Sequence, residues 1–354
     1  MERVKVYIEQ MDRTGIYSNF GPLYCQYIER VAGYFGVSRK KVMGISSGTS
    51  GLMGCLLVYK QRTGRPANEI TVAVPDWTFS ATLQAPLSLG MRVVLVDVGP
   101  QGYMTPENIK ELDIDVAIVV APFGDTTCVD AWKHVDKRDT FVIVDGAAAF
   151  FTASEFDRPC VISTHCTKGF STGEGGLVIC NDEDYISELV AVSSFGFRKT
   201  REAEVCGLNL KMSEISCAYG NASLDMLKTN KESLDNQVQM YSSLVGEKNY
   251  IKPFQPDFTR TTYNVRFREG AGIDIRDLVA HMASDYGIEV RKWWAGPMHT
   301  QRVSTHPDIE IEGEMVSSLH LDKTVVGIPM GPHVSKMDQE YIIKAFESYA
   351  SGLE

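Results

Sequence analysis

Residues 159–180 read PCVISTHCTKGFSTGEGGLVIC, and this stretch decides the class of fold. Two short apolar runs, at residues 159–163 and 176–180, enclose a polar loop that carries Lys168 among hydroxyl groups and glycines. Short apolar runs without alternation are typical of strands that are buried on both faces of a sheet. The stretch therefore predicts two buried strands, with the lysine loop between them.

Similar apolar runs precede this stretch along the chain. They predict strands at residues 69–74, 91–98, 116–121 and 140–144. Helix-like segments lie between several of these strands, for example at residues 78–89 and 105–112. Buried strands that alternate with helices indicate a mostly parallel sheet covered by helices on both faces. We therefore expect an α/β fold.

The pattern changes after Lys211. Residues 212–244 contain no proline and have apolar residues at helical spacing, which predicts a long helix, with or without a break. Beyond residue 249, predicted strands at 262–268, 289–293 and 323–328 mix with predicted helices at 275–286 and 336–349. This mixture indicates a smaller α+β domain. We expect a large domain over residues 1–240 and a small C-terminal domain over residues 241–354.

Charge and composition exclude several classes of function. The 354 residues include 35 Lys and Arg against 45 Asp and Glu, so the formal net charge is −10. This balance argues against nucleic acid or an anionic membrane as the main partner. No apolar run is long enough to cross a membrane, and residues 1–5 are charged, unlike the apolar core of a signal peptide. The sequence predicts a cytoplasmic protein.

The cysteines and histidines show no metal-binding pattern. Eight cysteines and seven histidines are dispersed along the chain, without a Cys-x-x-Cys pair or a zinc-like spacing. Most cysteines stand among apolar residues, where a reduced thiol packs as a small hydrophobic group. We therefore expect free, mostly buried thiols and no bound metal.

Residues 46–51, Ser-Ser-Gly-Thr-Ser-Gly, lead into an apolar helix. Small residues and the free amides of a helix start can bind a phosphate group. On these residues alone, an N-cap formed by a serine or threonine is the favoured explanation. Their spacing matches neither the dinucleotide-binding glycine pattern nor the Walker phosphate loop. The segment is a candidate anion site with an ordinary structural alternative.

Four further side chains stand at or near the ends of predicted strands. Trp77 and Phe79 lie at a strand-to-helix junction, where an aromatic ring either stacks on a planar cofactor or packs in the core. Asp145 ends an apolar strand, so its carboxylate needs a partner, which a catalytic site, a helix cap or a salt bridge would each supply. Lys168 is a candidate nucleophile for Schiff-base chemistry if burial lowers its pKa.

These segments together resemble the DegT/DnrJ/StrS family of sugar aminotransferases. Their order along the chain is Gly-Thr, an aromatic pair, a strand-end Asp, and Ser-x-x-x-x-Lys followed by Gly-Glu-Gly-Gly. Residues 19–22, 207–214, 287–291 and 297–301 resemble other landmarks of that family. The resemblance covers nearly the whole chain. It implies the three-layer fold type I of pyridoxal-phosphate (PLP) transferases and the cofactor pyridoxal 5′-phosphate.

The resemblance also implies roles for the main site residues. Lys168 would hold the cofactor as a Schiff base and then move a proton during the reaction. Asp145 would pair with the pyridine nitrogen and keep it protonated, so that the ring acts as an electron sink. The backbone of Gly48 and Thr49 and the hydroxyl of Ser163 would hold the cofactor phosphate.

Four more residues take roles by the same resemblance. Phe79 matches the position that stacks on the cofactor ring, with Trp77 beside it. Asn209 matches a residue that reaches across a dimer interface to the neighbour's cofactor phosphate, which implies a homodimer with shared active sites. An N-cap of the helix that begins near residue 212 is the alternative for Asn209. His299 lies in a C-terminal landmark and would contact substrate.

One position departs from the family pattern. The family usually has Gln or His three residues after the strand-end Asp, near the phenolic oxygen of the cofactor, and this chain has Ala148. The departure leaves the partner of that oxygen unidentified. Lys168 itself argues against the family's sugar 3-dehydratases, which have His at that position.

The predicted function is a PLP-dependent transaminase. It would move an amino group, with L-glutamate as the expected donor, to a keto group of a nucleotide-linked deoxysugar in polysaccharide or secondary-metabolite synthesis. A smaller keto-sugar acid or a phosphorylated ketone is the nearest alternative substrate. A regulatory homologue without catalysis is the alternative from another class.

Overall fold

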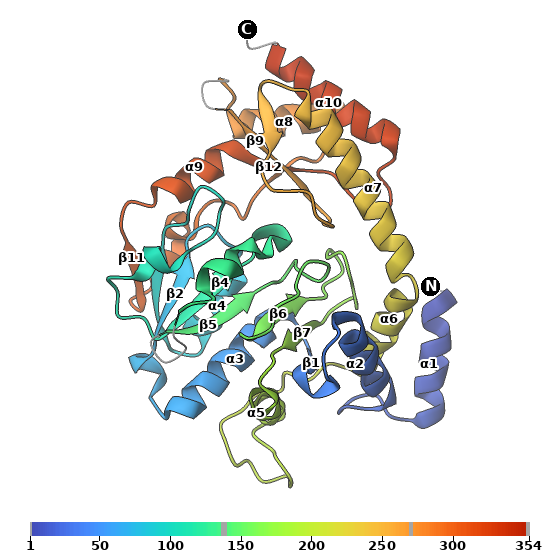
Figure 1. Ribbon diagram of the computed structural model, residues 1–354, viewed down its shortest axis with the longest axis vertical. Coiled ribbons are helices and arrows are strands. Elements are labelled where there is room, and N and C mark those ends of the chain that lie inside the picture. The colour runs from blue at the N-terminus through green and yellow to red at the C-terminus, as the bar shows by residue number, and fades with distance from the viewer. Residues whose placement is uncertain (1, 136–139, 269–271, 352–354) are drawn as a thin grey trace.

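A mostly parallel sheet forms the centre of this computed structural model, which describes residues 2–135, 140–268 and 272–351 (Figure 1). Within these residues the sheet has eight strands in the order β1-β7-β6-β5-β4-β2-β3-β11. They are β1 (Val42–Ile45), β7 (Gly176–Ile179), β6 (Cys160–Ser163), β5 (Phe141–Asp145), β4 (Val116–Val120), β2 (Thr71–Pro75), β3 (Arg92–Val96) and β11 (Ile309–Glu312). The strands from β6 to β11 in this order are parallel, and β7 is antiparallel to both its neighbours. The predicted α/β fold is confirmed.

Helices cover both faces of this sheet (Figure 1). Successive residues of β6 point into two different cores, because side chains alternate across a strand. Val161 packs in a core with residues of α3 and α5, whereas Ile162 packs in a core with residues of α2 and α6. The first face also carries α4 and the second carries α1. The bounds are α1 (Glu2–Thr14), α2 (Pro22–Phe35), α3 (Gly48–Thr63), α4 (Ser80–Ser88), α5 (Glu183–Ser193) and α6 (Glu214–Asp225).

The predicted long helix exists and has a break. It consists of α6 followed by α7 (Leu227–Gly246), and Met226 between them has φ −103° and ψ 0°, outside the helical range. Ser213 caps α6, because its side chain accepts a hydrogen bond from the amide of Ser216. Figure 1 shows that these two helices connect the large sheet to a smaller one.

The smaller sheet is antiparallel and has the order β10-β12-β9-β8 within the described residues. Its strands are β8 (Ile251–Pro253), β9 (Tyr263–Phe267), β10 (Arg291–Lys292) and β12 (Val325–Ile328). The helices α8 (Ile275–Tyr286) and α10 (Lys336–Ser351) pack on it together with α7 and enclose a separate core. The predicted α+β character of this part is confirmed.

Two predicted elements are shorter than expected. Residues 105–112 form only the 3₁₀ turn Pro106–Ile109, with Thr105 and Asn108 making a capping box. The strand predicted at 289–293 is reduced to β10, because Trp294 and Ala295 adopt positive φ values of 57° and 60° that end an extended segment.

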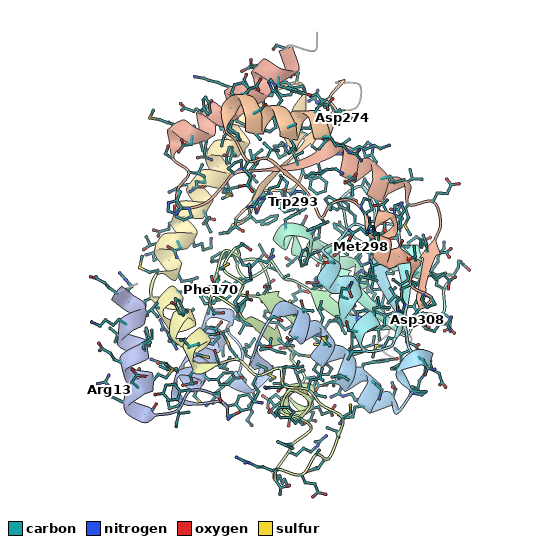
Figure 2. All side chains as sticks on the ribbon, turned by 180° about the vertical axis from the view of Figure 1, so that it is seen from behind. Arg13, Phe170, Asp274, Trp293, Met298 and Asp308 are labelled. Carbon is teal, nitrogen blue, oxygen red and sulfur yellow. The ribbon has the colours of Figure 1, made fainter. Side chains whose placement is uncertain are left out.

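The C-terminal part of the chain also contributes to the large sheet. After the first strands of the small sheet, residues 298–312 return to the large sheet. There β11 pairs in parallel with β3 and forms the edge of the large sheet. Met298 packs in the core of the large sheet, and the carbonyl of Asp308 accepts a hydrogen bond from the amide of Val93. Figure 2 labels Met298 and Asp308 in this returning segment. The chain then passes through α9 (Val316–Thr324) to β12. The domain boundary at residues 240/241 stays a prediction. Strand β11 follows that boundary in the sequence but belongs to the large sheet.

All eight cysteines are free thiols, and five of them are buried. Cys166 and Cys206 are exposed, in contrast to the others. In the described part of the chain, no group of three or more metal-ligating side chains could hold a metal ion. None of the described helices combines the length and apolar composition that a membrane span requires.

Candidate active site

A cavity of about 420 Å³ lies at the carboxyl ends of the parallel strands. The ends of β4, β5 and β6 contribute Val120, Asp145 and Ser163, and the starts of α3 and α4 contribute Gly48 and Phe79. Ligand sites of open α/β sheets form at this edge, because strand ends and helix starts converge there. The fold therefore brings together the four segments that the sequence singled out.

The start of α3 forms one wall of this cavity. Ser47 is its N-cap and accepts a hydrogen bond of 3.1 Å from the amide of Ser50. The first amides of a helix have no partner within the helix, so those of Gly48 and Thr49 are available to an anion. A Cβ on Gly48 would stand 3.2 Å from Cβ of Ser163, so glycine lets the helix start approach the end of β6. The cap and the predicted anion site thus coexist.

Asp145 lies at the floor of the cavity and is only 7% exposed. Its Oδ2 accepts a hydrogen bond from the hydroxyl of Thr82 at 2.8 Å, and its Oδ1 accepts one from the amide of Ala147 at 3.2 Å. Burial raises the pKa of Asp145, while these hydrogen bonds and the charge of Lys168 oppose the rise. Among the described residues, no lysine or arginine forms an ion pair with this carboxylate. It is therefore a buried anion suited to a cationic partner inside the cavity.

Lys168 lies in the loop between β6 and β7 and lines the same cavity. Burial lowers the pKa of its amine, and the charge of Asp145 opposes that shift. A lowered pKa increases the fraction of neutral amine, which is the nucleophilic form. The covalent role predicted for Lys168 stays a prediction, and its position and lowered pKa are compatible with it.

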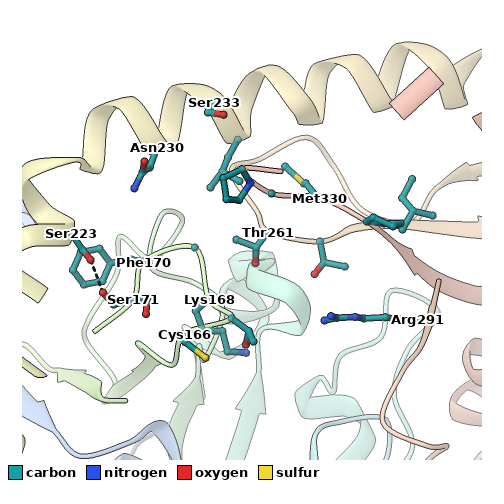
Figure 3. Close-up of a pocket in the computed structure, with 18 of the residues that line it drawn as sticks. Cys166, Lys168, Phe170, Ser171, Ser223, Asn230, Ser233, Thr261, Arg291 and Met330 are labelled. Carbon is teal, nitrogen blue, oxygen red and sulfur yellow. Dashed lines mark hydrogen bonds between the residues drawn. The ribbon is translucent and has the colours of Figure 1, made fainter. Parts of the chain in front are cut away.

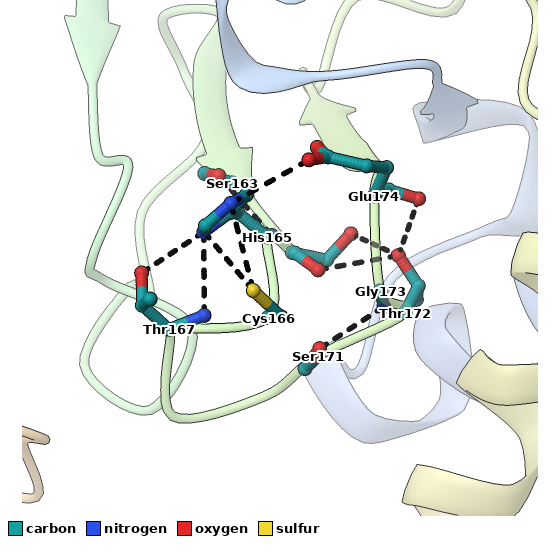
Figure 4. Close-up of polar contacts among 9 residues, drawn as sticks. Ser163, His165, Cys166, Thr167, Ser171, Thr172, Gly173 and Glu174 are labelled. Carbon is teal, nitrogen blue, oxygen red and sulfur yellow. Dashed lines mark hydrogen bonds and ion pairs between the residues drawn. The ribbon is translucent and has the colours of Figure 1, made fainter.

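Polar contacts hold the lysine loop in shape (Figure 4). The hydroxyls of Thr164 and Thr172 lie 2.6 Å apart at its base. The imidazole of His165 contacts the hydroxyl of Thr167 at 2.9 Å and the carboxylate of Glu174 at 3.5 Å. Such contacts position a reactive side chain before any ligand binds.

The two aromatic residues of the strand-to-helix junction lie in different surroundings. Phe79 is 59% exposed and forms part of the cavity wall. Trp77 is 1% exposed, packs against Phe123, Phe254 and Trp294, and does not line the cavity. The expectation that Trp77 contacts a cofactor is therefore corrected: its ring fills the apolar layer behind the wall.

His299 also lies outside the cavity. Its Nδ1 is 2.7 Å from Oδ2 of Asp76, and its amide donates to Oδ1 of the same carboxylate at 2.7 Å. Burial raises the pKa of Asp76, and the two contacts with His299 oppose the rise. His299 thus satisfies a buried carboxylate and ties residues 297–301 to the end of β2. The expected contact with substrate is corrected, since the ring faces Asp76.

Asn209 is exposed, and it is not among the described residues that line the cavity beside Lys168 or the one that adjoins it. Its Oδ1 accepts a hydrogen bond from Nζ of Lys211 at 2.7 Å. The N-cap alternative is wrong, because Ser213 caps α6. The predicted contact with a neighbouring subunit stays a prediction.

Several residues of the cavity escaped the sequence reasoning. Thr82 follows Thr78 by four residues, and their hydroxyls are 2.9 Å apart. This spacing, which places two side chains on the same side of a helix, was the sequence signal that could have pointed to Thr82. Arg291, Trp293 and Trp294 come from the small domain, and their sequence carries no signal of a position near Lys168. Ala148 does line the cavity.

The comparison with known families shows the family and the fold of the chain. The model of the DegT/DnrJ/EryC1/StrS aminotransferase family matches residues 1–347. The chain belongs to this family. Its members are PLP-dependent aminotransferases that act on sugars, so the predicted family and the three-layer PLP-transferase fold are confirmed.

Individual DegT-family relatives are distant in sequence. The Mycobacterium tuberculosis protein Rv3402c is 24% identical over 373 residues, which cover 96% of this chain and 85% of that protein. A dTDP-4-amino-4,6-dideoxy-D-glucose transaminase of Shigella dysenteriae is 24% identical over 240 residues, or 65% and 63% of the two chains. The crystal structure of a DegT/DnrJ/EryC1/StrS aminotransferase of Brucella abortus superposes with a TM-score of 0.84 at 22% identity, covering 99% of this chain and 95% of that one.

Proposed function

We propose that this chain is a PLP-dependent aminotransferase that transfers an amino group from L-glutamate to a keto group of a nucleotide-linked deoxysugar. The observation that carries the proposal is the convergence of a buried carboxylate, a partly buried amine and a free helix start on one cavity. These groups are Asp145, Lys168 and the start of α3, and they come from distant parts of the chain.

The residues present fit PLP. The amides of Gly48 and Thr49 and the hydroxyl of Ser163 would bind its phosphate, because they line one end of the cavity beside a helix start. Asp145 would hold the proton on the ring nitrogen, and the exposed ring of Phe79 would pack on the face of the cofactor. When bound, PLP supplies the electron sink that lets an amino group leave one carbon and join another.

The two titratable groups have complementary roles. Asp145 is buried, and its hydrogen bonds from Thr82 and Ala147 fix the position of the carboxylate that would face the ring nitrogen of a bound cofactor. Lys168, whose pKa burial lowers, would provide the amine that holds the cofactor covalently, and would afterwards carry a proton between the amino-bearing carbon of the substrate and the cofactor. The hydroxyl groups that support both residues keep them at fixed positions.

The size of the cavity system supports a large substrate. A second cavity of about 510 Å³ shares Thr167, Lys168 and Arg291 with the first one. A cofactor and a nucleotide-linked sugar need more room than the first cavity alone provides. The name of the Shigella dysenteriae relative describes a transaminase of a dTDP-linked dideoxysugar, and this name supports a nucleotide-linked sugar as the substrate. A smaller keto-sugar acid or phosphorylated ketone is the alternative substrate.

The proposal includes a cytoplasmic homodimer with shared sites. Asn209 is exposed and far along the chain from the lysine loop, and it lines neither of the two cavities described above. This placement supports a contact with the cofactor phosphate of a second copy.

Purified protein tests the proposal in two steps. With PLP, it should show an absorbance band in the visible that sodium borohydride bleaches, and mass spectrometry should then find the cofactor on Lys168. Lys168→Ala should lack this adduct and have no transaminase activity. A panel of nucleotide-linked keto sugars with L-glutamate should identify an amino-sugar product. A colourless protein that binds no PLP would contradict the proposal and favour the regulatory homologue.

A further inference from the structure

Arg291 lies where the two cavities meet. The cavity of about 420 Å³ and the cavity of about 510 Å³ share Thr167, Lys168, Thr261, Thr262 and Arg291 as lining residues. Figure 3 shows the guanidinium end of Arg291 directed toward the side of the cavity that holds Lys168. A group bound at Arg291 would therefore stand next to the reactive amine and between the two chambers.

The charges of the cavity walls single out this arginine. The described residues that line the two cavities include one lysine, Lys168, and one arginine, Arg291. Once Lys168 is used for covalent chemistry, Arg291 is the permanent positive charge that these walls retain. The chain as a whole has a formal charge of −10, so it does not attract anions by its overall field. An anionic substrate therefore needs this local cation.

The backbone of Arg291 is fixed, while its side chain can exchange partners. Arg291 belongs to β10 and pairs with Gly327 of β12. Its Nε lies 3.4 Å from Oε1 of Glu289, with the two side chains 54% and 81% exposed. Exposed ion pairs of this kind contribute little free energy, so a ligand can displace Glu289. A guanidinium presents parallel N–H donors that match the two oxygens of a carboxylate or phosphate.

We propose that Arg291 binds an oxyanion of the substrate that reacts at Lys168, with Glu289 as a competing partner. The inference rests on the proposed function and names the group that orients the substrate there. A carboxylate of the amino donor and a phosphate of the nucleotide carrier share this chemistry. Either one would hold the reacting end of its molecule beside Lys168.

Binding of two unreactive probes to the PLP-loaded protein tests the proposal. Glutarate represents the dicarboxylate donor and uridine 5′-diphosphate represents the nucleotide carrier, and isothermal titration calorimetry measures each dissociation constant. Arg291→Gln should weaken at least one probe about ten- to a hundredfold, as expected for losing hydrogen bonds to a charged group. Glu289→Gln should tighten the same probe, because it removes the competing carboxylate. Arg276→Gln, an exposed arginine on α8 that lines neither cavity, is the matched control and should leave both affinities unchanged.

The outcomes separate this inference from the proposed function. The probe that weakens identifies whether the oxyanion belongs to the donor or to the carrier. Changes below about threefold for both probes in Arg291→Gln, or no binding of either probe to the unmodified protein, would overturn the role of Arg291. The visible band and its loss with borohydride are recorded on the same samples. If the band is present while the affinities do not change, the aminotransferase proposal stands and only the role of Arg291 fails.

Discussion

Replacing Thr82 by valine isolates one hydrogen bond of the candidate site. Thr82 is buried, and its hydroxyl donates to Oδ2 of the buried Asp145 at 2.8 Å. Valine has nearly the same shape but no hydroxyl group, so the substitution removes the donor without opening a cavity. The same hydroxyl also lies 2.9 Å from that of Thr78, which loses a partner too.

The expected cost follows from the charge of the acceptor. A hydrogen bond to a charged group contributes about 1.5–3 kcal/mol, whereas a bond between neutral groups contributes about 1 kcal/mol. Thr82→Val should therefore lower the free energy of unfolding by about 1.5–3 kcal/mol where Asp145 is ionised. Where Asp145 is protonated, the loss should shrink to about 1 kcal/mol.

The loss of stability in Thr82→Val should depend on pH, because Asp145 titrates. Burial raises the pKa of Asp145 above its unfolded value, so the folded protein holds the proton more tightly than the unfolded chain. Stability is therefore lost as the pH rises from the unfolded pKa through the folded pKa. Thr82→Val removes an interaction that favours the charged form and raises this pKa further. The difference in stability between variant and unmodified protein should grow as the pH rises from about 4 toward 8.

Urea unfolding of the cofactor-free protein at several pH values measures this difference. Thr259→Val is a matched control, because Thr259 is also buried and donates to a carboxylate, that of Asp235, outside both cavities. The control should also lose stability, because it removes a hydrogen bond to a carboxylate outside the cavities. A pH-independent loss in Thr82→Val, or a loss below about 0.5 kcal/mol at pH 8, would refute the reasoning.

Three further predictions test other residues of the site. Asp145→Asn should reduce kcat/KM on the order of a hundredfold or more, because a neutral side chain no longer holds the proton on the ring nitrogen, and a change below about threefold would contradict the assigned role. Mixed dimers of Asn209→Ala and Lys168→Ala chains should retain about half of the unmodified activity if Asn209 acts across the interface. One active site then carries both defects and the other is intact. Activity no higher than in either parent variant would mean that Asn209 serves its own subunit. His299→Ala should lower the free energy of unfolding by roughly 3 kcal/mol, because it leaves the buried Asp76 without its ring partner, and it should barely change substrate affinity. Chemical denaturation and substrate titration check this last pair of effects, and a stable variant with lost substrate binding would restore a substrate role for His299.

Much of the fold was predictable from local sequence pattern. Strands such as β4 and β5 consist of consecutive apolar residues, and burial on both faces of a sheet is what such residues favour. The polar residues at the strand ends, Asp145 and Lys168, were visible because a charge next to a buried strand needs a partner. The order of these motifs was specific enough to predict the family. The edge strand β11 was missed, because its pattern Ile-Glu-Ile-Glu is short and mostly exposed.

The sequence by itself determined which segments are buried and which residue types stand at the ends of the strands. Only the tertiary structure decided which way individual side chains face. Phe79 faces the cavity while Trp77, two residues earlier, packs behind it, and His299 turns to Asp76 instead of the substrate space. Arg291 reaches the lysine loop from a chain segment more than a hundred residues away. Local composition sets the free energy of burial, but such contacts depend on how distant elements pack against one another, and no short stretch of sequence contains that information.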